Sequence, residues 1–329
     1  VTKVIKKFKY IHFLKFKNEP TYEELDVLKT KFKKVKNFDS IIGIGGGSCI
    51  DMAKGLALMI KNSGPSINYM GFPKKIKKPL PVIAVPTTVS TGSEIIYNAV
   101  FTSKNKKIKL GINSDLNYPI LAIMDSNLVK KAPKYIVLQS AIASLIRSIE
   151  TFTSIDANFI TKVFAKQSFE FLFKTLINLK SINKDSIEKL QWGCIFSMIA
   201  LSNSSSGPCG VINYFLSVNY NISQALAYNY KRIEFIKKNI DKGYFGYSDL
   251  VLEKKSKKEK LRYLKNGLKN IIKMNGKKID NAKKKIKNDV KFEKKMFDQF
   301  KKFNFTPLKK NPIYLTNNEL KQIIKNIKY

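Results

Sequence analysis

The feature that most limits how this chain can fold is a glycine triplet between two apolar segments. Residues 40–44 (SIIGI) are a short apolar run, Gly45-Gly46-Gly47-Ser48 follows, and CIDMAKGLALMIKN continues with the composition of a helix. An apolar run of this length is typical of a parallel strand that is buried on both faces. Glycines let the backbone approach phosphate oxygens, and the next helix offers free N–H groups and a positive dipole end. The order predicts a nucleotide-binding unit, although a tight turn would explain the triplet taken alone.

The first 138 residues repeat this alternation of strands and helices. Further strand candidates are the short runs 9–17 (KYIHFLKFK), 81–86 (PVIAVP) and 120–124 (ILAIM). Residues 21–35 have the apolar spacing of a helix, and Thr21 with Glu24 three residues later is a capping box. Residues 1–138 are therefore predicted to form an α/β domain with a doubly wound sheet.

The character of the sequence changes after residue 138. Long segments with helical apolar spacing replace the short runs, namely 140–152, 164–179, 188–203 and 224–238. Residues 254–302 are dominated by lysine and are expected to form solvated helices with degraded amphipathicity; a specific interaction surface is the alternative. Residues 139–329 are therefore predicted to form an all-helical domain.

The net charge of +37 would suit a partner that carries many phosphates. However, only three of the 61 basic residues are arginine, the residue that reads bases with a bidentate fork. The excess of Lys, Asn, Ile, Tyr and Phe is what AT-rich codons produce. We therefore expect a solvated basic surface and no specific nucleic-acid binding, with salt-sensitive, non-specific binding to polyanions as the alternative.

The three cysteines, Cys49, Cys194 and Cys209, are too far apart in the sequence for a disulfide framework or a metal clip. A reducing, cytoplasmic setting is expected. No apolar stretch is long enough to cross a membrane, so no membrane association is expected. The basic and aromatic start at Val1 lacks the cleavage pattern of a signal peptide and is interpreted as an incomplete N-terminus.

Motifs spread along most of the chain carry a family resemblance. They are 18–21 (NEPT), 45–54 (GGGSCIDMAK), 86–94 (PTTVSTGSE), a Pro119 to Asp125 segment, 201–203 (LSN), and 311–312 (NP) before a closing helix. Together they resemble the iron-containing alcohol dehydrogenase family and its wider dehydroquinate synthase-like superfamily. The resemblance implies a doubly wound α/β nucleotide-binding domain, an all-helical C-terminal domain, and NAD or NADP bound in the cleft between them.

The resemblance also implies a set of cofactor-binding residues. The set comprises Gly45, Gly46, Gly47, Ser48, Asp51, Thr87, Thr88, Thr91 and Lys109. The glycines and Ser48 would contact the pyrophosphate and the adjoining ribose, and the threonines would contact a phosphate and the nicotinamide ribose. Asp51 is expected in the first turn of its helix, where a role in starting the helix is an equal alternative. Ser90 stands where the family usually has glycine.

Family members hold a divalent metal with one aspartate and three histidines, and this metal lowers the pKa of the bound alcohol. The corresponding positions here hold Ala143, Arg147, Gly210 and Gln224. The chain contains one histidine, His12, which falls in a predicted strand of the other domain. A three-histidine site is therefore impossible, and neither iron nor zinc is expected.

Two functions remain open. In the first, the chain is an NAD(P)-dependent oxidoreductase that acts on a small alcohol or aldehyde without metal. Arg147 would then offset the charge that develops on the substrate oxygen, and Tyr214, which replaces a histidine usually found near the substrate, would donate the proton. In the second, the chain is a catalytically inactive cofactor-binding or scaffold protein, and Arg147 simply pairs with Glu150 on its helix. A homodimer is a further expectation.

Overall fold

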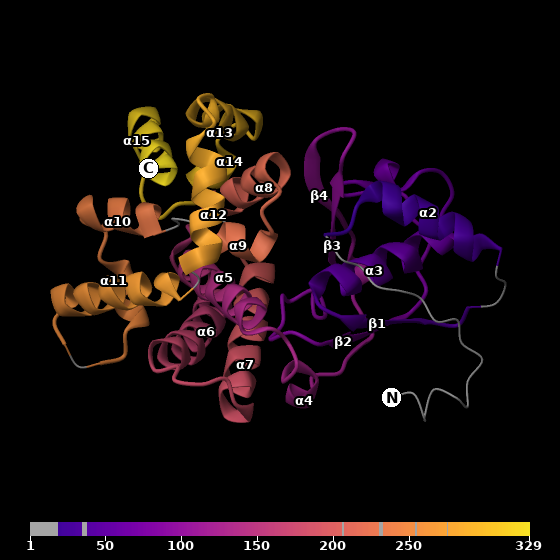
Figure 1. The fold of residues 1–329 in the computed structure, drawn as a ribbon, viewed down its shortest axis with the longest axis horizontal. Coiled ribbons are helices and arrows are strands. Elements are labelled where there is room, and N and C mark those ends of the chain that lie inside the picture. Colours follow the sequence, from indigo (N-terminus) through magenta and orange to yellow (C-terminus); the bar gives the residue numbers. More distant parts are fainter. Residues whose placement is uncertain (1–18, 35–37, 206, 230–232, 254, 275) are drawn as a thin grey trace.

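The computed structural model describes residues 19–34, 38–205, 207–229, 233–253, 255–274 and 276–329. The predicted strand 9–17 and its His12 lie outside the described residues. The described residues form an α/β part and a helical part that lie side by side (Figure 1). No described helix is both long enough and apolar enough to cross a membrane.

Three parallel strands form the sheet at the centre of the α/β part. They are β1 (Ile41–Gly45), β2 (Val82–Pro86) and β5 (Leu121–Ala122), in the order β1-β2-β5. The three predicted strands are thus confirmed, the last one in a shorter form. Helix α3 (Gly47–Lys61) packs on one face, where a Cβ at Gly43 would lie 3.0 Å from the Cβ of Ala53. The absence of a side chain at Gly43 therefore lets α3 approach the sheet closely.

The opposite face of this sheet is not buried, and the expectation that residues 40–44 are covered on both sides was wrong. Ile42 pairs with Ile83, and Ile83 pairs with Leu121, so the three side chains form a row across one face. Ile42 remains 50% exposed and Leu121 remains 49% exposed. The reason is that α3 covers the face of Gly43, whereas Ile42 and Ile83 line a large cleft.

A β-hairpin and an N-terminal helix complete the α/β part. Strands β3 (Asn98–Ser103) and β4 (Ile108–Asn113) pair antiparallel, an element that the sequence analysis did not predict. The predicted capping box is confirmed, because α2 (Tyr22–Lys33) starts at Thr21 with both of its reciprocal hydrogen bonds to Glu24. Tyr22 of α2 packs on Phe101 of β3 and donates a hydrogen bond from its hydroxyl to the carbonyl of Leu110. Short helical turns lie in the connections of this part, at η1 (Ser66–Tyr69), η2 (Asp115–Asn117) and α4 (Ser126–Val129).

Every regular element of the described chain after β5 is helical, as predicted for the second part. The longest are α5 (Lys134–Thr153), α6 (Phe159–Ile177) and α7 (Lys184–Ser202), which pack on one another. Because α5 begins at Lys134, the domain boundary predicted after residue 138 falls inside this helix. The later elements are α8 (Pro208–Tyr220), α9 (Gln224–Asn229), α10 (Ile233–Asp241), η3 (Gly246–Leu250), α11 (Lys257–Lys273), α12 (Gly276–Lys287), α13 (Phe292–Lys302), α14 (Thr306–Lys309) and α15 (Asn317–Lys328).

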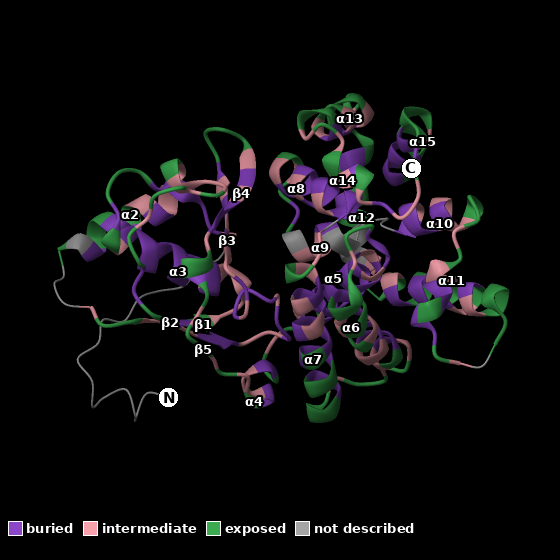
Figure 2. Cartoon of the chain, turned by 180° about the vertical axis from the view of Figure 1, so that it is seen from behind, coloured by how far each residue is buried: buried purple, intermediate pink, exposed green. Residues whose placement is uncertain are grey.

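The lysine-rich helices are strongly amphipathic, so the expectation of degraded amphipathicity was wrong. In α11, Leu261, Leu264, Leu268 and Ile271 are buried in the core shared with α5, α6 and α7. Figure 2 shows the same division, with buried residues along the inner side of α11 and exposed residues along its outer side. Lysines occupy the exposed positions because a long charged side chain keeps its ammonium group in water.

Candidate functional site

A cleft of about 2730 Å³ lies between the α/β part and the helical part. Its α/β wall contains the carboxyl end of β1, the start of α3 and the loop between β2 and β3. Its helical wall contains residues of α5, the end of α7 and the cleft-facing side of α8. The carboxyl ends of parallel strands are where open α/β sheets bind their ligands, so this cleft is the candidate site.

The glycine loop forms a cradle at the end of β1. Gly45 ends the strand, Gly46 is the N-cap of α3, and Gly47 is its first residue, with no side chain bonded to the cap. A Cβ at Gly47 would overlap the hydroxyl oxygen of Thr91, and a Cβ at Gly46 would lie 3.3 Å from the side chain of Thr88. A side chain at Gly47 would therefore displace the neighbouring loop, and the uncapped helix start faces a space that suits an anion.

The threonines of the next loop lie against this cradle, but not all of them face the cleft. Thr88 and Thr91 line the cleft, whereas Thr87 does not and donates its backbone N–H to Gly45 instead (2.9 Å). The hydroxyl oxygen of Thr88 is buried and has no hydrogen-bond partner among the described residues. A buried hydroxyl without a partner is costly, so a ligand that bonds it would relieve this cost.

Ser90 holds the turn between these threonines in a left-handed conformation. Its φ is +90°, a region that favours glycine. The Ser90 hydroxyl accepts from the N–H of Gly92 (2.9 Å) and donates to the carboxylate of Glu94. Burial raises the pKa of Glu94, and the hydrogen bond from Ser90 opposes this rise. The serine thus offsets its backbone strain by giving a buried carboxyl group a partner.

The structure corrects the position of Asp51. It is the fifth residue of α3, and the first turn contains no acidic residue. Asp51 lines the cleft but is largely buried, with its carboxylate 3.6 Å from the Nζ of Lys54. Burial raises the pKa of Asp51, and the charge of Lys54 counteracts that rise. Its contact with a cofactor stays a prediction.

Lys54, which the sequence analysis did not single out, fixes the loop beyond the threonines. Its ammonium group is buried and donates to the carbonyls of Ser93 (2.8 Å), Ile96 (3.0 Å) and Asn98. Three carbonyl acceptors hold one charged donor in place more firmly than a single ion pair would. Lys54 therefore ties α3 to the loop that lines the cleft.

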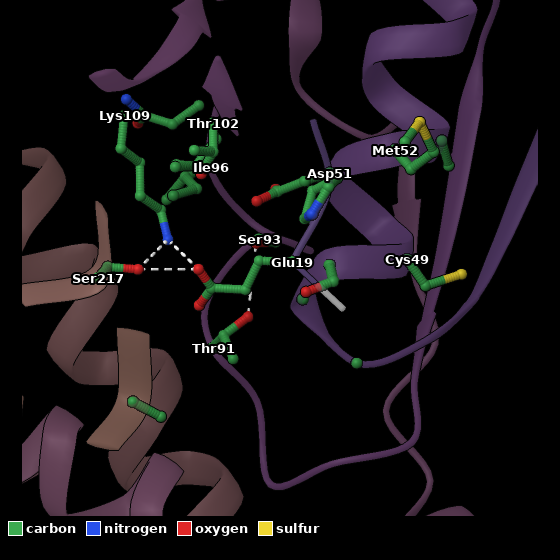
Figure 3. A pocket seen from close by; sticks show the side chains of 18 of the residues that line it. Glu19, Cys49, Asp51, Met52, Thr91, Ser93, Ile96, Thr102, Lys109 and Ser217 are labelled. Atoms are coloured by element: carbon green, nitrogen blue, oxygen red, sulfur yellow. Dashed lines mark hydrogen bonds and ion pairs between the residues drawn. The ribbon is translucent and has the colours of Figure 1, made fainter. Parts of the chain in front are cut away.

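Lys109 connects the two parts of the molecule. It extends from β4, pairs with the carboxylate of Glu19, and donates to the hydroxyl of Ser217 on α8 (3.1 Å). Ser217 donates to the same carboxylate (3.0 Å), so the three side chains close a ring of contacts at the cleft (Figure 3). Lys109 was predicted as a site residue from the sequence, but its contacts with Glu19 and Ser217 were not, because the three residues are far apart along the chain.

Three of the four positions predicted to correspond to metal ligands have described side chains, and none of the three offers a metal donor. Ala143 and Arg147 lie one turn apart on α5 and line the cleft, and Gly210 lies in the first turn of α8. A methyl group, a guanidinium cation and a hydrogen atom offer no donor to a divalent metal. The Gln224 side chain lies outside the described part of the structure. Within the described residues, no cluster of three or more His, Cys, Asp or Glu side chains could hold a metal ion.

Arg147 and Tyr214 both face the cleft from the helical wall. Arg147 is 8% exposed, and one of its terminal nitrogens lies 3.5 Å from the hydroxyl of Ser144. Glu150, the alternative partner expected for Arg147, accepts a hydrogen bond from the backbone N–H of Cys209 (2.8 Å). The helical wall therefore presents a cation and a phenol to the cleft.

Comparisons with known proteins agree with this architecture. The family model for iron-containing alcohol dehydrogenases matches residues 1–126. Alcohol dehydrogenase 4 of Schizosaccharomyces pombe is 31% identical over 191 residues, which are 57% of this chain and 45% of that protein. The N-terminal part of the chain is thus similar to iron-containing alcohol dehydrogenases. The NAD-dependent methanol dehydrogenase of Bacillus methanolicus is 29% identical over 62% of this chain and 53% of its own length.

Solved structures of an alcohol dehydrogenase and of an aldehyde reductase share the fold along nearly the whole chain. An alcohol dehydrogenase from Oenococcus oeni superimposes with a TM-score of 0.86 at 20% identity, covering 99% of this chain and 86% of its own. Sulfoacetaldehyde reductase from Bifidobacterium kashiwanohense, solved in complex with NAD⁺, superimposes with a TM-score of 0.82 at 20% identity and the same coverage. In sequence, by contrast, the chain spans about half the length of the curated relatives it matches.

Proposed function

We propose that this chain binds NAD or NADP in the cleft and acts as an oxidoreductase on a small alcohol or aldehyde. The observation that carries the proposal is the fit between the uncapped start of α3, Gly47, and the buried Thr88 hydroxyl that lacks a partner among the described residues. These groups together offer N–H donors, a dipole and a hydroxyl to a diphosphate. Relatives that carry NAD-dependent and 4-hydroxybutyrate dehydrogenase names support a small-molecule substrate.

The chemistry that we propose for the helical wall uses no metal. A bound reduced nicotinamide would supply the hydride. Arg147 would hold its positive charge close to the substrate oxygen and stabilise the negative charge that develops there. Tyr214, from the facing side of α8, would donate the proton that turns this oxygen into a hydroxyl. The guanidinium group of Arg147 is largely buried, which strengthens its effect on a nearby charge.

A second candidate function is cofactor binding without catalysis. The observation that favours it is that Ala143 and Gly210, which line the helical wall, have no side-chain group that could take part in catalysis. In that case the chain would act as a cofactor-binding pseudoenzyme or scaffold. The two candidates share the same α/β wall and differ only in what Arg147 and Tyr214 do.

Two measurements test these functions, and the second separates them. The first is a titration of the purified chain with NADH and with NADPH, followed by nicotinamide fluorescence. Saturable binding is expected, and no binding of either cofactor at millimolar concentration would overturn both candidates.

The second measurement is aldehyde reduction with a chelator, and again with added Fe²⁺ or Zn²⁺. Turnover that resists the chelator supports the metal-free oxidoreductase. Turnover that requires added metal would contradict it, and cofactor binding without turnover would establish the second candidate.

A further inference from the structure

The helical wall of the cleft carries a single charge among its described residues, the guanidinium group of Arg147. An arginine side chain does not lose its proton in proteins, so this charge is present at every pH at which the chain is folded. The α/β wall, by contrast, carries both signs of charge, from Glu19, Glu24, Asp39, Asp51, Lys104, Lys107 and Lys109. A substrate that lies against the helical wall therefore meets one fixed positive charge there.

Hydroxyl groups accompany this cation on the same wall. Ser140, Ser144 and Arg147 recur at helical spacing on α5, and all three line the cleft. Ser144 is 1% exposed, and its hydroxyl lies 3.5 Å from a terminal nitrogen of Arg147. Ser204, between α7 and α8, also lines the cleft, and its buried hydroxyl oxygen has no hydrogen-bond partner among the described residues. The wall thus combines one cation with neutral hydroxyl donors, and a carboxylate accepts hydrogen bonds from both kinds of group.

Two carboxyl groups close to this wall do not line the cleft. Glu150, one turn further along α5, accepts a hydrogen bond from the backbone N–H of Cys209 (2.8 Å). Glu94 accepts from the hydroxyl of Ser90, and burial raises the pKa of Glu94, which favours its neutral form. An anion in the cleft can therefore reach Arg147 without first meeting a carboxylate of the helical wall.

We propose that the substrate carries a carboxylate directly on its carbonyl carbon, as 2-oxo acids do, and that Arg147 binds it. This inference rests on the proposed function and names the substrate class of the same site. The guanidinium group is a planar fork that binds two oxygens at once. A 2-oxo acid presents such a pair, because its carbonyl oxygen and one carboxylate oxygen can lie on the same side of the molecule. One fork then holds the carboxylate and stabilises the charge that develops on the reacting oxygen.

The reaction at this site is the reduction of a 2-oxo acid to a 2-hydroxy acid. The hydride of a reduced nicotinamide forms the new C–H bond at the carbonyl carbon, and the π electron pair of the carbonyl moves onto its oxygen. Tyr214 donates its proton to that oxygen and regains a proton from water. The products are the 2-hydroxy acid and the oxidised nicotinamide. The carboxylate is unchanged, so it contributes recognition and orientation only.

Oxamate and oxamide are matched, unreactive probes for this inference, because they differ only in the replacement of a carboxylate by an amide. Calorimetric titration of the chain with each probe, with and without saturating NADH, measures their binding. We expect oxamate to bind at least about 100-fold more tightly than oxamide, because the amide leaves the buried cation without a counter-charge. Equal affinity for the two probes, or no binding of oxamate, overturns the inference.

Arg147→Met and Arg147→Lys test the location, and Arg262→Met is the matched control. Arg262 is exposed on α11 and does not line the cleft. Arg147→Met should abolish the preference for oxamate, whereas Arg147→Lys keeps the charge without the fork and should retain only part of it. Arg262→Met should bind both probes as the wild type does. A preference that survives in Arg147→Met would place the anion site elsewhere and refute the inference.

Two outcomes separate this inference from the proposed function. Reduction of propanal with NADH by a chain that does not prefer oxamate would keep the oxidoreductase and remove the carboxylate from its substrate. Binding of oxamate that requires Arg147, in a chain that binds neither NADH nor NADPH, would keep the carboxylate site and remove the cofactor.

Discussion

At the glycine loop, the α/β wall of the cleft is formed by backbone and small side chains, whereas the facing helical wall presents the guanidinium group of Arg147 and the phenol of Tyr214. On the first wall, Gly46 and Gly47 lie against Thr88 and Thr91, and their fit depends on the absence of a Cβ. On the second wall, Ala143 and Arg147 line the cleft one turn apart on α5. A backbone cradle fails when any side chain is added, but a wall of side chains can change its chemistry one residue at a time. The two walls of the cleft are therefore not equally tolerant of substitution.

The strongest test of this comparison is Gly47→Val on the α/β wall. Its side chain would collide with Thr91 and push the loop away from the start of α3, so NADH affinity should fall at least about 100-fold. Fluorescence titration measures the affinity, and thermal unfolding confirms that the variant is folded. Gly276→Val is the control, because a Cβ there meets no atom within 4 Å. Equal NADH affinity in the two variants would remove the glycine loop from the cofactor site.

Arg147→Met tests the helical wall in the same assay. The substitution keeps a long side chain in a largely buried position but removes the charge, so metal-free turnover should fall about 100-fold while NADH binding stays unchanged. The measurement compares the change in kcat with the change in NADH affinity, because a helical-wall residue should alter only kcat. A loss of NADH binding without a change in kcat would mean that Arg147 belongs to the cofactor side.

Glu94→Gln tests the loop between the two walls through the pH dependence of the free energy of unfolding. Burial raises the pKa of Glu94 above its ordinary value of 4.5 in the folded chain. The folded chain therefore holds this proton more tightly than the unfolded chain, and the stability that it contributes is lost as pH rises from 4.5 through the folded pKa. Glu94→Gln should remove this loss and stabilise the protein by about 1 kcal/mol at neutral pH relative to pH 4.5. Urea unfolding at the two pH values measures it, and a parallel change in wild type and variant would contradict the assignment.

Ser90→Gly should have the smallest effect on stability, because the relief of backbone strain and the loss of hydrogen bonds oppose each other. Glycine relieves a left-handed backbone by about 1 kcal/mol, but the change deletes the hydroxyl that bonds Glu94 and Gly92, at a similar cost. The free energy of unfolding should therefore change by less than about 1 kcal/mol. Combining Ser90→Gly with Glu94→Gln isolates the energy of coupling between the hydroxyl and the carboxyl group, which a double-mutant cycle measures. Strict additivity of the two changes would show that the hydroxyl and the carboxyl do not interact.

Local chemistry explains which parts of the fold were predictable. The glycine loop, the capping box at Thr21 and the closing helix after Pro312 each follow from residues a few positions apart. The hairpin β3–β4 was missed because residues 98–103 (NAVFTS) do not alternate in polarity. Their burial does alternate, but Asn98, Val100 and Thr102 on the less buried face differ in polarity, so the sequence carries no period-two signal there.

The rest of the site depends on contacts that no short stretch of sequence contains. The exposure of Ile42 was not predictable, because an apolar strand looks the same whether one face or two are covered. The same limit applies to Asp51, whose place in the second turn of α3 depends on where the helix starts. Lys54 lay within a recognised motif, yet its role appears only when the carbonyls of Ser93 and Ile96 come close to it.

The ring formed by Glu19, Lys109 and Ser217 has a consequence for how the chain folds. Its three contacts join residues that are 90, 108 and 198 positions apart in the sequence. Local elements form first, and contacts with such long loops form late, because closing a long loop costs more chain entropy. We therefore expect the ring to close only after β4 and α8 have formed, in the same step that docks the α/β part on the helical part and gives the cleft both of its walls.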